Sequence, residues 1–123
     1  MFELSIEESF SAAHQLPGYP GACSRLHGHN YRVRLTVRGD ELNEQGMLVD
    51  FAELKRICRD ALGRLDHRFL NDLPEFQDRP PTSENLARLI FAQVASRLPA
   101  GPARLAEVTV FESEVARATY REG

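Results

Sequence analysis

The sequence predicts an α+β fold with the element order strand, strand, helix, helix, strand, strand. Alternating polar and apolar residues mark strands near both ends of the chain, and apolar residues three and four positions apart mark two helices between them. Strands are expected at residues 2–14, 30–38, 105–112 and 116–121, and helices at 50–65 and 82–98. At 123 residues we expect a single domain that spans residues 1–123.

The first strand ends in a histidine. Its even positions from Phe2 to Ala12 are mostly apolar, whereas the odd positions up to Ser11 are Glu or Ser. His14 has the parity of the apolar face, so we expect its ring at the edge of the core, where a site can receive it. The alternative is an ordinary histidine of the core or its rim.

The second strand begins in a histidine pair. Its apolar residues from Tyr31 to Val37 alternate with polar ones, and His27 and His29 share the parity of the apolar set. The intervening loop, residues 15–25, contains two Pro-Gly dipeptides, which favour turns. We therefore expect an antiparallel pair of strands that brings His14 alongside His27 and His29.

Each helix has a start signal. Asp50, followed by Glu53 three residues later, predicts the start of the first helix, and Thr82 predicts the cap of the second, which is expected to end at Pro99. Cys58 falls within the apolar stripe of the first helix. We interpret it as a small buried hydrophobic residue.

Composition and charge exclude several classes of partner. The formal net charge is -3 and no segment is rich in Lys or Arg, which argues against a nucleic-acid or anionic-membrane surface. No apolar run approaches the roughly 18 residues that span a bilayer, and the N-terminus lacks the pattern of a signal peptide. We expect a cytoplasmic protein, in which two cysteines do not form a disulfide framework.

The segment from Cys23 to His29 has the composition of a reactive centre. In an extended His27-Gly28-His29 segment both rings project to the same side and form a two-point metal clamp. The third ligand could be His14, His67 or a carboxylate. Three histidines would leave an open position, as in catalytic zinc sites, whereas Cys23 as a fourth ligand would close the site. Cys23 could instead carry a proton, because a nearby cation lowers a thiol pKa.

Two further positions carry candidate chemistry. Asp66 directly precedes His67, and an adjacent carboxylate can raise the pKa of an imidazole and fix its tautomer for proton transfer. The alternative is a solvated histidine after a helix. Glu112 has the parity of an apolar strand face, so it is either paired or ligand-facing, unless it reaches water at the strand end.

Five motifs make the sequence similar to the 6-pyruvoyltetrahydropterin synthase superfamily, most closely to its 6-carboxytetrahydropterin synthase branch. The resemblance covers nearly the whole chain and includes all four histidines. The spacing of three residues between Cys23 and His27 resembles the carboxy-product branch, because the pyruvoyl-product branch typically has a longer insertion there. The motifs are Phe10-Ser11-Ala12-Ala13-His14, Cys23-x3-His27-Gly28-His29-Asn30-Tyr31, Leu65-Asp66-His67, Pro81-Thr82-Ser83-Glu84-Asn85 and Val108-Thr109-Val110-Phe111-Glu112.

The resemblance implies a role for each site residue. Zn²⁺ would be bound by three histidines, Cys23 would accept a proton, and His67, oriented by Asp66, would transfer a second proton. Glu112 would anchor the pterin, since one carboxylate can accept two parallel hydrogen bonds from its 2-amino group and ring N–H. Thr82 and Ser83 would add contacts to the ring. The implied metal ligands are His14, His27 and His29, while Arg25 and Arg68 are candidates for the triphosphate.

The implied activity is that of a zinc-dependent carbon–carbon lyase. The substrate would be 7,8-dihydroneopterin triphosphate, and the products 6-carboxy-5,6,7,8-tetrahydropterin, a queuosine precursor, with acetaldehyde and triphosphate. The alternatives are a 6-pyruvoyltetrahydropterin synthase, which eliminates triphosphate without releasing acetaldehyde, and a non-catalytic zinc-stabilised pterin-binding module.

The resemblance also implies a fold and an assembly. The family's tunnelling fold is a four-stranded antiparallel sheet with two helices on one face, in the order ββααββ read from the periodicity. Its members form barrel-shaped trimers, usually paired into homohexamers, with active sites shared between subunits. Shared sites would bring residues that are far apart in the chain around one ligand and would cover open sheet edges.

Overall fold

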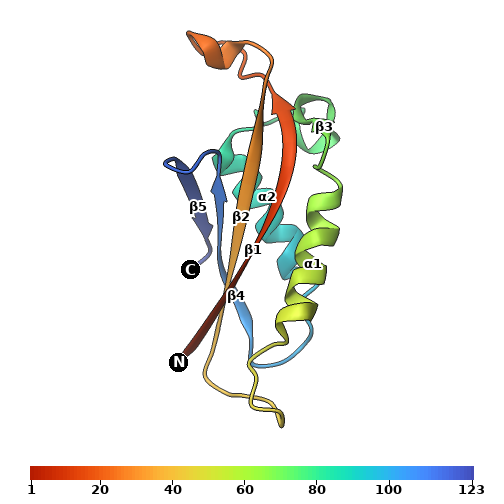
Figure 1. The fold of residues 1–123 in the computed structure, drawn as a ribbon, viewed down its shortest axis with the longest axis vertical. Helices are drawn as coiled ribbons and strands as arrows, with labels where there is room; N and C mark the ends of the chain where they lie inside the picture. Colours follow the sequence, from red (N-terminus) through yellow and green to blue (C-terminus); the bar gives the residue numbers. More distant parts are fainter.

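The computed structural model describes residues 1–123 apart from the side chain of Cys23. Strands β1 (Phe2–His14), β2 (His27–Gly39), β3 (Arg68–Phe69), β4 (Arg104–Phe111) and β5 (Arg117–Arg121) form one sheet in the order β3-β1-β2-β4-β5. Helices α1 (Phe51–Gly63) and α2 (Ser83–Ala95) lie on one face of it (Figure 1). The short helical turns are η1 (Ala22–Ser24), η2 (Leu70–Asp72) and η3 (Pro74–Phe76). The predicted α+β class is confirmed, and the four predicted strands and two predicted helices occur in the expected order.

The sheet has one strand more than predicted. The four long strands are antiparallel, as expected, but β3 adds a fifth strand that runs parallel to β1 and pairs with Ala12 and Ala13. The backbone N–H of His67 donates to the Ser11 carbonyl just before this pairing begins. Two residues are too few to show periodicity, so the sequence pattern did not reveal β3.

Strands β1 and β2 form a hairpin, and three of the histidines lie at the end of it where the two strands are joined. The two strands pair without interruption from Phe2 opposite Gly39 to His14 opposite His27. Even residues of β1 and odd residues of β2 point toward the helices, because side chains alternate across a strand. The predicted register parity of the three histidines is therefore confirmed.

Both helices begin where the sequence predicted. The Asp50 carboxylate accepts a hydrogen bond from the Ala52 N–H at 2.9 Å, and the Thr82 hydroxyl accepts one from the Asn85 N–H at 3.2 Å. The regular part of α2 ends at Ala95, earlier than predicted. The Leu98 N–H still donates to the Val94 carbonyl, so a looser turn carries the apolar pattern onward to Pro99.

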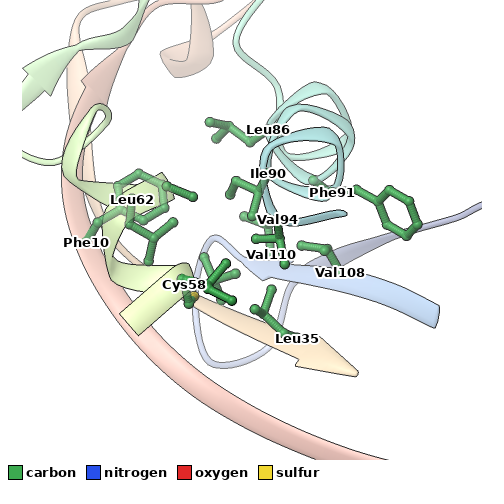
Figure 2. Close-up of a cluster of buried hydrophobic side chains, with 14 of the residues drawn as sticks. Phe10, Leu35, Cys58, Leu62, Leu86, Ile90, Phe91, Val94, Val108 and Val110 are labelled. Carbon is green, nitrogen blue, oxygen red and sulfur yellow. The ribbon is translucent and has the colours of Figure 1, made fainter. Parts of the chain in front are cut away.

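The hydrophobic core lies between the helices and the inward face of the sheet. Figure 2 shows side chains of α1 and α2 directed at those of β2 and β4, with Cys58 among them. Burial raises the pKa of the Cys58 thiol to about 12, which fits the predicted role of an inert core residue. In the part of the chain that the structure describes, no helix has the length and apolar character needed to cross a membrane.

Candidate active site

Four side chains from three places in the sequence meet at the end of the β1–β2 hairpin. His14 closes β1, His27 and His29 open β2, and Glu112 directly follows β4. One nitrogen or oxygen atom from each residue lies within 4.8 Å of the others. His14 is fully buried, while the other three are partly exposed. The group is therefore an inward-facing cluster that is open on one side.

Backbone carbonyls fix the tautomers of two of these rings. His14 Nδ1 lies 2.8 Å from the Pro81 carbonyl oxygen, and His27 Nδ1 lies 2.7 Å from that of Arg25. A carbonyl only accepts hydrogen bonds, so each Nδ1 carries the proton and each Nε2 of the neutral ring presents a lone pair. The two Nε2 atoms face each other at 2.9 Å. A bound cation would relieve the repulsion between these lone pairs.

A third nitrogen converges on the same point. His29 Nε2 is buried and has no hydrogen-bond partner within the described structure. It lies 3.1 Å from Glu112 Oε1, although without hydrogen-bonding geometry. Burial lowers the pKa of His29 by more than the negative charge of Glu112 raises it. The lowered pKa favours the neutral ring, which is the form that binds metals. A shared proton could bridge only two of these nitrogens. The convergence of three nitrogens therefore favours a bound metal ion over a shared proton.

The donor set fits a metal ion of the zinc class. Imidazole nitrogens, joined by a carboxylate oxygen, are ligands that such ions accept. Ligating histidines usually donate their second N–H to a carbonyl or carboxylate, as His14 and His27 do here. The cluster of His14, His27, His29 and Glu112 could therefore hold a metal ion.

A cavity of about 440 Å³ opens beside the cluster. This volume is within the usual range for small-molecule sites. Thr82 and Ser83 at the start of α2 line it, so the three predicted pterin contacts share one cavity with a predicted metal ligand. Its lining includes His14, Leu16, Tyr19, Thr82, Ser83 and Glu112. The Thr82 oxygen already caps α2, which leaves its hydroxyl proton free to donate.

His67 lies elsewhere. It lines a different hollow together with Ser11, Asn30 and His29. The side chains of Ser11 and Asn30 are hydrogen-bonded to each other at 2.7 Å on the outward face of the sheet. Its Nδ1 is 3.0 Å from Asp66 Oδ2, the pairing predicted from sequence. A single chain thus brings His67 and Asp66 together but does not place them at the four-residue cluster.

Asp66 is itself held in place. Its Oδ1 accepts a hydrogen bond from the Ser11 N–H at 2.9 Å. That bond, followed by the one to His67, holds the pKa of the Asp66 carboxyl below its ordinary value of 3.8. The carboxylate is therefore charged at neutral pH and fixes the orientation of the His67 ring.

Of the other predicted site residues, the side chain of Cys23 lies outside the described part of the structure. The two arginines suggested for the triphosphate lie apart from each other. Arg25 holds His27 through its carbonyl, and Arg68 lines the hollow that contains His67.

Asn71 is a site residue that the sequence did not reveal. Its Oδ1 accepts from the Gln15 N–H at 2.9 Å, and its Nδ2 donates to the Gln15 carbonyl at 2.8 Å. These two bonds satisfy the backbone N–H and carbonyl of Gln15, the residue directly after His14, in the way that a partner strand would. The sequence signal is only an asparagine in an irregular segment, which gives no indication of its distant partner.

Comparison with known proteins decides the family. The model of the family described as 6-pyruvoyl tetrahydropterin synthase matches residues 3–123, nearly the whole chain. The chain belongs to this family. The placement predicted from the five motifs is confirmed.

Curated relatives of this 6-pyruvoyl tetrahydropterin synthase family member fall into two product classes. The 6-carboxy-5,6,7,8-tetrahydropterin synthase of Bacillus subtilis is 45% identical over 79% of this chain and 68% of its own. That of Synechocystis sp. is 42% identical over 98% of this chain and 93% of its own. The 6-pyruvoyl tetrahydrobiopterin synthase of Drosophila melanogaster is 35% identical over 96% of this chain and 78% of its own.

A solved structure of the family has the same fold. The 6-pyruvoyl tetrahydropterin synthase of Caenorhabditis elegans superimposes with a TM-score of 0.87 and 32% identity, covering 99% of this chain and 96% of its own. The match confirms the tunnelling fold of the family. Together with the names of the curated relatives, it supports a lyase of the tetrahydropterin synthase type.

Proposed function

We propose that the protein is a 6-carboxy-5,6,7,8-tetrahydropterin synthase, a zinc-dependent carbon–carbon lyase. It would convert 7,8-dihydroneopterin triphosphate and one water molecule to 6-carboxy-5,6,7,8-tetrahydropterin, acetaldehyde and triphosphate. The observation that carries the proposal is the convergence of three imidazole nitrogens beside a cavity that ends in a carboxylate. Three nitrogen ligands and an accessible side are typical of catalytic zinc.

In this proposal His14, His27 and His29 hold the zinc ion. When bound, the metal would polarise oxygens of the substrate side chain and so acidify the neighbouring C–H. The carbonyls of Pro81 and Arg25 keep two of the rings in the tautomer that binds metal. Glu112, also within reach of the cluster, is then free to face the cavity.

Glu112 would anchor the pterin ring. A carboxylate can accept two parallel hydrogen bonds from the 2-amino group and ring N–H of a pterin, as it does from a guanidinium. Thr82 and Ser83 line the same cavity at the start of α2 and would donate to the ring. The ring would thereby be fixed with its side chain directed toward the histidines.

Proton transfer would use residues of two subunits. Cys23 would accept the proton from the substrate carbon, and His67, oriented by Asp66, would transfer a second one. His67 is not among the four residues that converge beside the cavity in the described chain, so in this proposal a neighbouring subunit would bring it there. The outer edge of β5 and most of the outer edge of β1 carry no partner strand in the described chain, which suits assembly as a trimer or a dimer of trimers. In this proposal the enzyme acts in the cytoplasm, in the queuosine pathway.

A sequence feature and a comparison support the carboxy product. Cys23 and His27 are separated by three residues, the spacing that resembles the carboxy-product branch. The two 6-carboxy relatives described above are also more similar to this chain than the Drosophila enzyme is. The pyruvoyl product is the second candidate, because the Drosophila relative matches across almost the entire chain.

Incubation with 7,8-dihydroneopterin triphosphate tests the proposal. The zinc-loaded protein should release acetaldehyde and triphosphate in equal amounts and form 6-carboxy-5,6,7,8-tetrahydropterin. Triphosphate release without acetaldehyde would assign the protein to the pyruvoyl branch. Release of neither product would contradict a catalytic function.

Replacement of Cys23 separates a proton acceptor from a metal ligand. Cys23→Ala should reduce turnover by about 10²- to 10⁴-fold, the usual contribution of a general base, while zinc stoichiometry is unchanged. Cys58→Ala is the matched control, since that thiol is buried in the core. Loss of zinc from Cys23→Ala would instead favour the closed, non-catalytic site.

A further inference from the structure

The outward face of the sheet carries a cluster of arginines opposite the candidate active site. Ser9, Arg32, Phe111 and Arg117 are direct cross-strand neighbours on β1, β2, β4 and β5. This face is not covered by α1 or α2, which lie behind the sheet (Figure 1). Phe111 is nevertheless only 2% exposed. Its ring must therefore be covered by neighbouring side chains.

Three guanidinium groups cover the Phe111 ring. Their central carbons lie 4.1 Å (Arg32), 5.1 Å (Arg34) and 5.5 Å (Arg117) from the ring centroid. Attraction between a cation and an aromatic face operates at these distances and holds the long side chains in place. Phe111 thus gathers three positive charges on one small area.

The cluster is short of negative charge. Arg34 donates to the Glu7 carboxylate at 2.8 Å. Arg32 Nε lies 3.3 Å from the same carboxylate, but it is buried and makes no hydrogen bond in the described structure. Arg117 is in no ion pair among the described residues. Among the described residues, the three guanidinium groups therefore have one paired carboxylate, that of Glu7, in a chain whose net charge is -3.

Two other arginines of the same face are each paired with one carboxylate. Arg38 donates to Glu3 at 2.7 Å, and Arg121 pairs with Glu107. The cluster of Arg32, Arg34 and Arg117 differs from these two arginines in its excess positive charge. Guanidinium groups match phosphate oxygens with two parallel hydrogen bonds, which makes such an excess suited to phosphate.

We infer that Arg32, Arg34 and Arg117 form a binding site for an inorganic oligophosphate on the outward face of the sheet. Arg32 and Arg117 approach Phe111 from strands on either side of β4, about 10 Å apart at the backbone. A chain of linked phosphates can contact both guanidinium groups, with further bonds to Arg34. A single phosphate has fewer oxygens to share among the three groups and should bind more weakly.

This site is separate from the pterin cavity. Arg117 also lines a small hollow with Glu84 and Glu112, but these two carboxylates oppose an anion there. The outward side of Arg117 has no such acidic neighbour in the row from Ser9 to Phe111. The inference does not depend on the proposed catalytic function, because it needs neither metal nor pterin.

Calorimetric titration of the metal-free protein with sodium tripolyphosphate tests the site. We expect saturable binding with one anion per chain, and affinity about tenfold lower in each of Arg32→Ala and Arg117→Ala, the loss typical of a charge-assisted hydrogen bond. Arg38→Ala is the matched control, because this arginine lies on the same face but is paired with Glu3. The affinity of Arg38→Ala for tripolyphosphate should differ from that of the unmodified protein by less than about threefold.

Several results would overturn the inference. One is a loss of tripolyphosphate affinity in Arg38→Ala that equals the loss in Arg117→Ala. Another is orthophosphate binding as tight as tripolyphosphate binding. A third is binding of a Glu-rich peptide that is tighter than binding of either phosphate. Circular dichroism checks that each variant is folded. If Arg32→Ala is misfolded, Arg117→Ala and Arg117→Gln at the exposed edge strand decide the question, and unchanged affinity in both would also overturn it.

Discussion

The four histidines of the chain occupy two settings that differ in almost every physical respect. His14, His27 and His29 face inward and converge on one point, and two of them are oriented by backbone carbonyls. The side chain of His67 is 82% exposed and touches its own neighbour, Asp66. The inward histidines converge within one chain, whereas His67 is ordered but is not part of that cluster.

His67 is nevertheless strongly constrained. Its backbone has φ of 58°, a left-handed conformation that is uncommon outside glycine, and its N–H donates to the Ser11 carbonyl at 2.6 Å. Its ring is tied to Asp66, which Ser11 in turn holds. Backbone strain that surrounding contacts maintain is typical of functional positions. Under the proposed function, this arrangement suits a histidine that acts at the site of a neighbouring subunit.

Alanine substitution in each setting should give the largest difference. His27→Ala removes one of three converging nitrogens, so we expect loss of bound zinc and of all measurable turnover. His67→Ala should retain one zinc per chain and lose turnover by about 10²- to 10⁴-fold. Elemental analysis with a product assay measures both. Zinc loss in His67→Ala would place that ring at the metal and remove the distinction.

Mixing two inactive variants tests whether the settings meet across subunits. Chains carrying Cys23→Ala and chains carrying His67→Ala, unfolded and refolded together, should regain about a quarter of the wild-type activity if each site combines two subunits. Each variant refolded alone should stay inactive. An inactive mixture of correctly assembled chains would show that both residues act within one subunit.

Glu112 belongs to the inward cluster and also lines the cavity, so its replacement refines the first setting. In Glu112→Gln we expect unchanged zinc content, since three histidines remain, and weaker binding of the pterin by about 10- to 100-fold, because one charge-assisted acceptor is lost. Fluorescence titration with a pterin and elemental analysis measure these effects. Substantial zinc loss would instead make Glu112 a fourth ligand.

Asn71→Ala should have the smallest effect. The variant leaves the backbone of Gln15 without its two side-chain hydrogen bonds, directly beside His14. We expect a loss of about 1–3 kcal/mol in the free energy of unfolding and a weaker zinc affinity. Gln77→Ala, which removes a donor to the Asn71 carbonyl but leaves both bonds to Gln15, is the control. Equal zinc affinity in both variants would exclude a positioning role for Asn71.

Local patterns predicted the inward histidine setting. Strand parity depends only on neighbouring residues, so the alternation of β1 and β2 was enough to group His14 with His27 and His29. It also placed Glu112 on the inward face, where the structure finds it beside His29 with 34% of its side chain exposed.

Features that depend on distant contacts were not predictable. The hydrogen bond from His14 to the Pro81 carbonyl, and the bonds from Asn71 to Gln15, join segments whose proximity only the folded chain creates. The burial of Phe111 on an outward face likewise depends on arginines from two other strands. A two-residue strand such as β3 is too short to have a period at all.

The register of the β1–β2 hairpin has a consequence for how such enzymes can diverge. His14 and His27 are cross-strand partners, so the segment between them is a loop whose ends are held together by the sheet. Insertions into such a loop cost little, about 0.6 kcal/mol for each doubling of its length, and they shift no strand residue. Cys23 belongs to this loop in the sequence. If Cys23 is the proton acceptor, as proposed, its reach can therefore change over evolution while His14, His27 and His29 keep their places in the register.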